Sequence, residues 1–138
     1  MKKVENMLNF NDISWELPKF KEDIFFEKRY SYALVIPIIN EGERIQRQLQ
    51  NIKDSKILVD VILADGGSTD GSVDLEYLSV AGVRCLLTKV DQGKLSAQLR
   101  MAYAWCIRQG YKGVVTVDGN GKDVMSAVTD FVSKLEDG

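Results

Sequence analysis

The chain has 138 residues, of which 45% are apolar and 28% charged, as expected for a single soluble globular domain. Its formal net charge of −2, without a basic block, excludes non-specific nucleic-acid binding. No apolar run approaches the roughly 20 residues that span a bilayer, and the N-terminus lacks a signal-peptide pattern, so we expect a cytoplasmic protein with no transmembrane segment. The absence of histidine excludes Ser-His-Asp and Cys-His catalysis. Cys85 and Cys106 lie within apolar patterns and are interpreted as reduced core residues.

Residues 1–31 are predicted to form a helical, aromatic extension that packs against the outside of the domain or a partner. This segment contains too many large apolar side chains for a disordered tail. Pro18 interrupts any helix, so a short helix is expected only over residues 19–28. The segment carries no recognisable chemistry.

From residue 32 onward the sequence alternates strand and helix patterns. Continuous apolar runs are typical of buried parallel strands, and apolar residues repeating every three or four positions predict helices. The expected strands are residues 32–37, 57–64, 83–88 and 114–118, and the expected helices are residues 43–53, 72–81, 94–109 and 123–136. Pro37 is expected at the end of the first strand. The alternation predicts an α/β domain over residues 32–138, with a parallel sheet of about four strands, helices on both faces and right-handed crossovers.

The stretch 59–70 organises this pattern. A buried strand ends at Asp65, two glycines then allow the backbone to turn, and Ser68 or Thr69 is expected to cap the next helix. In open α/β sheets ligands bind at the carboxyl ends of the strands, so Asp65 is expected near a ligand. The alternative is a strand-turn-helix corner in which this acid only caps its loop.

The loops expected at the same sheet edge carry several further polar residues. Clustered carboxylates repel one another unless a cation or a donor lies between them. The helix that follows Gly93 directs its positive end toward this edge, which suits a phosphate. Oxygen ligands alone suit Mg²⁺ or Mn²⁺ carried on a diphosphate. The alternative is that these polar residues are only solvated loop ends. The expected convergence of the loops at one edge favours a nucleotide-diphosphate site instead. The residues of this site are Asn40, Glu41, Asp65, Asp91, Gly93, Lys94, Asp118, Asn120 and Asp123.

Four ordered motifs resemble the family-2 glycosyltransferases with the GT-A fold, and most of all their polyprenyl-phosphate sugar transferase branch. The motifs are VIPIINE at residues 35–41, LADGGSTDG at 63–71, GKLSAQLR at 93–100 and VDGN at 117–120. The resemblance covers about residues 32–136. Each motif alone is weak, but the ordered set is specific.

The resemblance implies an inverting transfer from a UDP- or GDP-linked sugar, with a polyprenyl-phosphate acceptor and a peripheral position at the membrane. A divalent metal, Mg²⁺ or Mn²⁺, would neutralise the departing diphosphate. Asp118 and Asn120 match the metal motif. The nucleotide-binding positions implied by the same matches are Pro37, Asn40, Glu41, Asp65, Gly93, Lys94 and Asp118.

The sequence departs from the family pattern at Asn120 and Gly66, where the family has aspartates. Losing a carboxylate weakens the attraction for a divalent ion unless Asp123 replaces it. The family's acceptor region and catalytic base are expected beyond residue 138, so no catalytic residue is assigned and the domain is interpreted as an incomplete GT-A fold. A sheet edge without its next strand predicts a homo-oligomer.

Two alternatives to the transferase remain at this point. The first is a catalytically inactive GT-A-like module that acts by nucleotide binding or self-association. The second, a nucleotidyltransferase, is weaker because no glycine-rich phosphate loop follows the first strand of the α/β domain.

Overall fold

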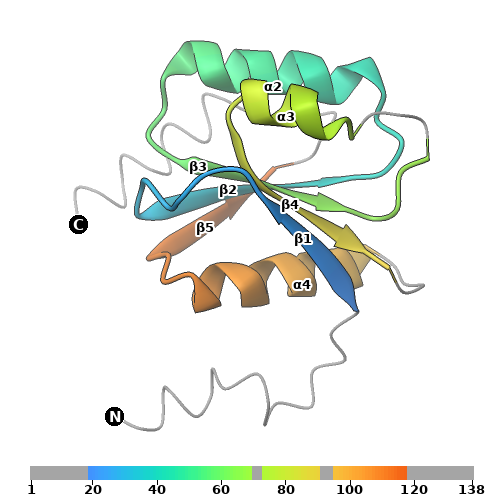
Figure 1. The fold of residues 1–138 in the computed structure, drawn as a ribbon. Helices are drawn as coiled ribbons and strands as arrows, with labels where there is room; N and C mark the ends of the chain where they lie inside the picture. The colour runs from blue at the N-terminus through green and yellow to red at the C-terminus, as the bar shows by residue number, and fades with distance from the viewer. Residues whose placement is uncertain (1–18, 70–72, 91–94, 118–138) are drawn as a thin grey trace, which may run out of the picture.

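The computed structural model describes residues 19–69, 73–90 and 95–117 (Figure 1). In this part of the chain one five-stranded sheet, in the order β1-β4-β3-β2-β5, is accompanied by three helices. The elements are β1 (Phe20–Ile24), β2 (Tyr32–Ile38), α2 (Glu43–Ser55), β3 (Asp60–Asp65), α3 (Leu75–Val80), β4 (Val83–Lys89), α4 (Leu95–Arg108) and β5 (Gly113–Thr116). The predicted α/β class is confirmed.

Strands β2, β3, β4 and β5 form the parallel part of the sheet. β2 pairs with β3 from Ala33↔Asp60 to Ile38↔Asp65, and it pairs with β5 on its other side. All residues of β3 and all but one of β2 are buried, which explains why both read as continuous apolar runs. β2 extends one residue beyond Pro37, and β3 begins at Asp60 rather than at residue 57.

Helices α2 and α3 lie above the sheet in Figure 1, and α4 lies below it. With right-handed crossovers, the connecting helices lie on one face of the sheet as long as each new parallel strand is added on the same side of the previous one. They lie on the other face once a strand is added on the opposite side. The alternation of side chains along each strand therefore divides the core in two. Leu34, Ile36 and Leu63 pack with α2 and α3, whereas Val35 and Ile62 pack with α4.

The expectation of a short helix over residues 19–28 is wrong, because residues 20–24 form strand β1. β1 runs antiparallel to β4, from Phe20↔Lys89 to Ile24↔Cys85, and raises the number of strands to five. The free edge of β4 offers backbone groups that β1 satisfies, and this tertiary pairing overrides the weak local preference for a helix. Residues 1–18 lie outside the described part of the chain.

The expected helix cap at Ser68 or Thr69 is also wrong. Helix α3 begins at Leu75, and the Asp74 carboxylate accepts a hydrogen bond from the backbone N–H of Glu76 at 3.0 Å. The expected last helix, at residues 123–136, lies outside the described residues. Both cysteines are buried and unpaired with each other. No helix in the described ranges is both long and apolar enough to cross a membrane.

Candidate functional site

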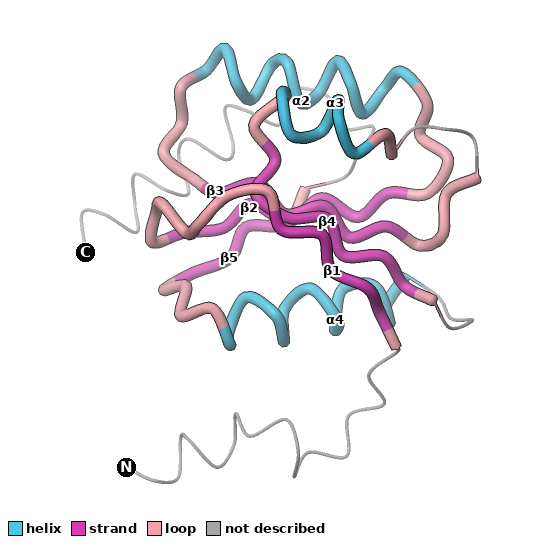
Figure 2. The backbone as a smooth tube through the Cα atoms, in the orientation of Figure 1, coloured by secondary structure: helices cyan, strands magenta, loops and turns pink. Residues whose placement is uncertain are grey.

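The direction of the chain reverses beside β2. From β2 the chain adds β3 and then β4 on one side, whereas β5 pairs with the opposite side of β2. Figure 2 shows the loops after β2 and β3 leaving the sheet at the same end, on the right of the view. In open α/β sheets, ligands bind in the crevice at such a reversal, outside the carboxyl ends of the strands. After β5, the N–H of Val117 donates to the Val35 carbonyl at 3.0 Å, so Val117 continues the pairing with β2 beyond Thr116.

Asp65, the last residue of β3, has a carboxylate that turns back onto its own loop. The residue is only 1% exposed. Its Oδ1 atom accepts hydrogen bonds from the Ser68 hydroxyl at 2.6 Å and from the Ser68 N–H at 3.1 Å, and Oδ2 shares that N–H at 3.2 Å. Gly67 supplies the left-handed backbone, with φ +106°, that this turn requires. Asp65 therefore fixes the conformation of residues 66–68.

Asn40 joins the loop after β2 to the loop after β3. Its N–H donates to Ser68 Oγ at 2.9 Å, and its side-chain Oδ1 accepts from the Thr69 N–H at 2.8 Å. The Asn40 backbone is left-handed, with φ 50°, which asparagine tolerates better than most residues. Ser68 thus links Asn40 to Asp65, and the exposed surface of this link is formed by Asn40, Gly67 and Thr69.

Gln98 from α4 supports both loops from inside the protein. Its side chain is buried, and Nε2 donates to the carbonyls of Ile38 at 3.1 Å and Ala64 at 2.9 Å. A Cβ atom on Gly66 would lie 2.9 Å from Cδ and Oε1 of Gln98. The space of a side chain at position 66 is therefore occupied by Gln98. Gln98 lies within the GKLSAQLR motif, and its role as a support for both loops is not predicted by the sequence pattern.

Pro37 and Glu41, two further predicted site residues, lie before and after the end of β2 and differ in their surroundings. Pro37 lies within β2 opposite Ala64, and is half-buried. Glu41 starts the turn into α2, where its carboxylate lies 3.2 Å from Nη2 of Arg44 and its carbonyl accepts from the Arg44 N–H. This internal ion pair leaves Asn40 as the exposed polar side chain at the end of β2.

The remaining predicted site residues lie outside the described part of the chain: Asp91, Gly93, Lys94, Asp118, Asn120 and Asp123. Among the described residues, no group of three His, Cys, Asp or Glu side chains could hold a metal ion. The structure thus joins Asn40 and Asp65, and the predicted metal ligands stay a prediction.

A second polar network, missed by the sequence analysis, lies at the opposite end of β3. Asp60 is 1% exposed, and its Oδ2 accepts from the N–H groups of Arg29 and Tyr30, at 3.0 and 3.2 Å, and from the Tyr111 hydroxyl at 2.8 Å. Buried Arg84 donates to the same hydroxyl at 3.2 Å. Burial, aided by the hydrogen bond to Asp60, raises the pKa of Tyr111 above its ordinary range.

Arg84 extends this network across α4 and the segment before β2. Its Nη2 donates to Oε1 of Gln109 at 3.0 Å and its Nε to the carbonyl of Phe26 at 3.1 Å. The guanidinium also lies 5.0 Å from the centre of the Trp105 ring. Every one of these contacts joins protein segments to one another, so the network stabilises the fold.

Comparison with known proteins yields no family model, curated protein or solved structure that matches this chain. The function proposed below is therefore inferred from the geometry at the carboxyl edge of the sheet and from the sequence motifs.

Proposed function

We propose that the chain binds a nucleoside-diphosphate sugar at the carboxyl edge of the sheet, as the donor-binding half of an inverting glycosyltransferase. The observation that carries this proposal is the link from Asn40 through Ser68 to Asp65, which joins two loops at the reversal point beside β2. Such an edge suits a nucleotide because the loops that follow neighbouring strands converge there.

Within this proposal the exposed link supplies the contacts to the nucleoside. The Asn40 amide has donors and acceptors suited to a base or a ribose hydroxyl, and Gly67 allows close approach of the ligand to the backbone. Asp65 acts first by holding this loop in place. Direct contact of Asp65 with the base requires the Ser68 hydroxyl to rotate away from Oδ1.

The proposal assigns a divalent ion, Mg²⁺ or Mn²⁺, to Asp118 and Asn120, which match the metal motif of the family that the sequence resembles. Carboxylate and amide oxygens suit either ion. When bound, the ion would supply electrostatic stabilisation of a diphosphate. Gly93 and Lys94 are proposed to lie beside that diphosphate, and a polyprenyl phosphate is proposed as the acceptor.

One observation favours the alternative of an inactive module that acts by nucleotide binding or self-association. Asp65 is buried with its carboxylate occupied by Ser68, and Gln98 fills the space where a second acid at position 66 would stand. In this alternative the motif residues are retained for the fold of the loops.

Thermal unfolding with UDP or GDP and Mn²⁺ tests the proposal. A nucleotide present at about 100 times its Kd stabilises the folded state by about 2.7 kcal/mol. We expect this stabilisation in the wild-type chain and its loss in Asn40→Gly, since glycine keeps the left-handed backbone but removes the amide. Asp54→Ala, at an exposed aspartate of α2, is the matched control and should retain the full shift.

No shift at millimolar nucleotide, or an equal shift in Asn40→Gly, would exclude this site. Gel filtration with and without nucleotide addresses the alternative directly. A stable oligomer whose size and melting temperature ignore the nucleotide would support the self-associating module instead.

A further inference from the structure

The four parallel strands begin at the end of the sheet opposite the candidate site, and their pairing brings the segments before them together. Tyr32 of β2 pairs with Gly113 of β5, and Ala33 of β2 pairs with Asp60 of β3. Strand β4 begins beside the start of β3. We call the surface formed by these segments and the last turn of α2 the amino edge; it comprises residues 25–31, 53–59, 81–82 and 109–112.

The amino edge carries an excess of exposed positive charge. Its exposed cations come from three segments that are far apart in the sequence: Lys28, Arg29, Lys53, Lys56 and Lys112. Against these five cations, the same residue ranges contain two acids, Glu27 and Asp54. The chain as a whole has a net charge of −2, so the positive character of this edge is created by the fold and is not visible as a basic block in the sequence.

Contacts at the amino edge leave most of this charge uncompensated. Arg29 has a nearby carboxylate, since its Nε atom lies 3.9 Å from Asp60. Lys53 Nζ donates at 3.1 Å to a backbone carbonyl, which is neutral. Lys28 Nζ lies 5.3 Å from the centre of the Tyr111 ring, whose face attracts a cation without carrying a net charge. These neutral partners orient the two lysines but do not cancel their charge.

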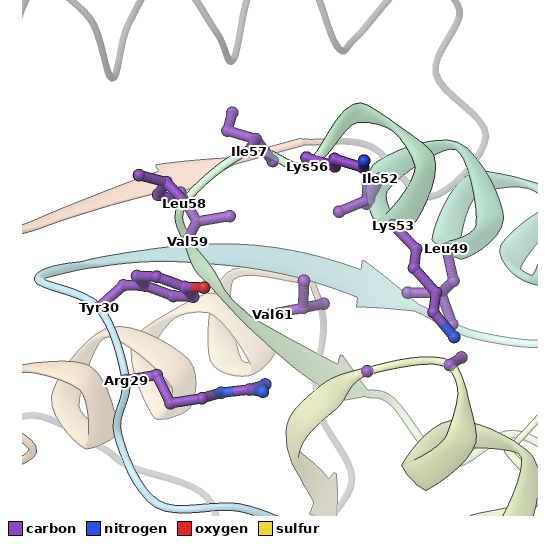
Figure 3. A pocket seen from close by; sticks show the side chains of 12 residues that line it. Arg29, Tyr30, Leu49, Ile52, Lys53, Lys56, Ile57, Leu58, Val59 and Val61 are labelled. Carbon is purple, nitrogen blue, oxygen red and sulfur yellow. The ribbon is translucent and has the colours of Figure 1, made fainter.

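Exposed apolar side chains lie beside the cations. Leu58 is 61% exposed. It lines a hollow of about 350 Å³ together with Arg29, Lys53 and Lys56 (Figure 3). The floor of this hollow is packed core, so its accessible surface is the rim that these four side chains form. Val80, whose carbonyl holds Lys53, is 70% exposed. Exposed apolar side chains among cations are the combination that surfaces lying on a membrane use.

We propose that the amino edge binds the surface of a bilayer that contains anionic phospholipids, with its cations among the headgroups and Leu58 in the interface. Four of the five cations are lysines, which are flexible point charges and lack the fixed fork that arginine offers to one phosphate or carboxylate. They are spread over three segments, so they match a layer of many anionic groups better than a single bound anion. The inference is independent of the proposed nucleotide site, which lies at the opposite ends of the strands.

Co-sedimentation of the full chain with vesicles tests this surface. We expect binding to vesicles of mixed phosphatidylserine and phosphatidylcholine, and much weaker binding to phosphatidylcholine alone. The double variant Lys53→Gln, Lys56→Gln should bind the mixed vesicles about 25-fold more weakly, at about fivefold for each cation. The double variant Lys21→Gln, Arg47→Gln removes the same charge from exposed positions outside the amino edge. This control should stay within about twofold of the wild type at physiological salt, where charges more than about 8 Å away are screened.

Leu58→Ala tests the apolar contribution and leaves every cation in place. It should weaken binding to the mixed vesicles by about five- to tenfold, because less apolar area enters the interface. Val90→Ala, at a residue that is 63% exposed and follows β4 at the other end of the sheet, is the matched control and should bind as the wild type does.

Equal binding to neutral and mixed vesicles would overturn the proposal, as would an equal loss in the lysine variant and its control. Unchanged binding in the lysine and Leu58 variants would also overturn it, because the chain would then attach through another surface, such as the carboxyl edge with a lipid-linked acceptor. Binding to RNA or to an acidic peptide without binding to the mixed vesicles would overturn it in favour of a soluble polyanion.

Discussion

Strand β3 begins and ends with a buried aspartate, and the two carboxylates have opposite kinds of partner. Asp60 accepts hydrogen bonds from Arg29, Tyr30 and Tyr111, which lie 30 to 51 positions away in the sequence. Asp65 accepts only from Ser68, three positions away, among the bonds described here. The two aspartates are equally buried, but Asp60 joins segments that are distant in the sequence, whereas Asp65 closes a local loop.

This difference separates a structural carboxylate from a candidate binding one. Distant donors that converge on Asp60 cannot be released without separating parts of the fold. The Ser68 hydroxyl, in contrast, lies only three positions from Asp65, so its bond to Oδ1 closes a local turn. Burial alone is thus a poor guide to function, and the identity of the partners is a better one.

Asp60→Ala should have the largest effect on stability. The substitution leaves the N–H groups of Arg29 and Tyr30, and the Tyr111 hydroxyl to which buried Arg84 also donates, without their acceptor. Removing one side of a buried charged network costs about 3–5 kcal/mol. Urea unfolding measures this loss, with exposed Asp54→Ala as a control expected to change stability by less than about 0.5 kcal/mol. A cost for Asp60→Ala as small as the control's would refute its structural role.

Gly66→Asp should destabilise the fold by about 1–3 kcal/mol, as overpacking does. Its Cβ would stand 2.9 Å from Gln98, whose amide must then move from the carbonyls of Ile38 and Ala64. Gly66→Ala should show part of the effect. Combining Gly66→Asp with Gln98→Ala should cost less than the sum of the two single variants, measured by the same urea titrations. Strict additivity would show that the two positions do not compete for space.

Alkaline pH should destabilise the wild type more steeply than Tyr111→Phe. Burial raises the folded-state pKa of Tyr111, so its stabilisation is complete below the unfolded value of about 10 and is lost as pH rises above it. One such proton changes the slope by at most about 1.4 kcal/mol per pH unit.

The measurement for Tyr111 is the free energy of unfolding between pH 9 and 11, where the ordinary tyrosine range begins. Burial also raises the pKa values of Cys85 and Cys106 to about 12, which acts in the same direction. Both cysteines are present in either protein, so the difference between wild type and Tyr111→Phe isolates the phenol. Parallel pH profiles would contradict the assignment.

Asn40→Gly should have the smallest effect on stability, about 1 kcal/mol. It removes the side-chain acceptor of the Thr69 N–H but keeps the backbone bond to Ser68 and the left-handed conformation. Asn40→Asp, which preserves an acceptor, should remain within about 0.5 kcal/mol of the wild type in thermal unfolding. An equal loss in both variants would show that the amide oxygen does not hold the loop.

The parallel part of the fold could be predicted because β2, β3 and β4 are long apolar runs separated by amphipathic helices. Strand β1 could not, because its short mixed sequence becomes a strand only through pairing with the edge of β4. At the candidate site, Asp65 and Asn40 were predictable from their places after buried strands. The role of Gln98 was not, since it depends on α4 passing beneath two strand ends that are far away in the sequence.

The strand order also has a consequence for biosynthesis. β1 is translated first, yet its hydrogen-bonding partner β4 emerges about sixty residues later, and the free side of β2 waits for β5. Pairings of such large sequence separation form slowly, because closing the long loop between the two strands costs chain entropy before their contacts contribute stability. A nascent chain that ends after β3 therefore carries a first strand without its hydrogen-bonding partner, and such an unpaired strand is prone to aggregation.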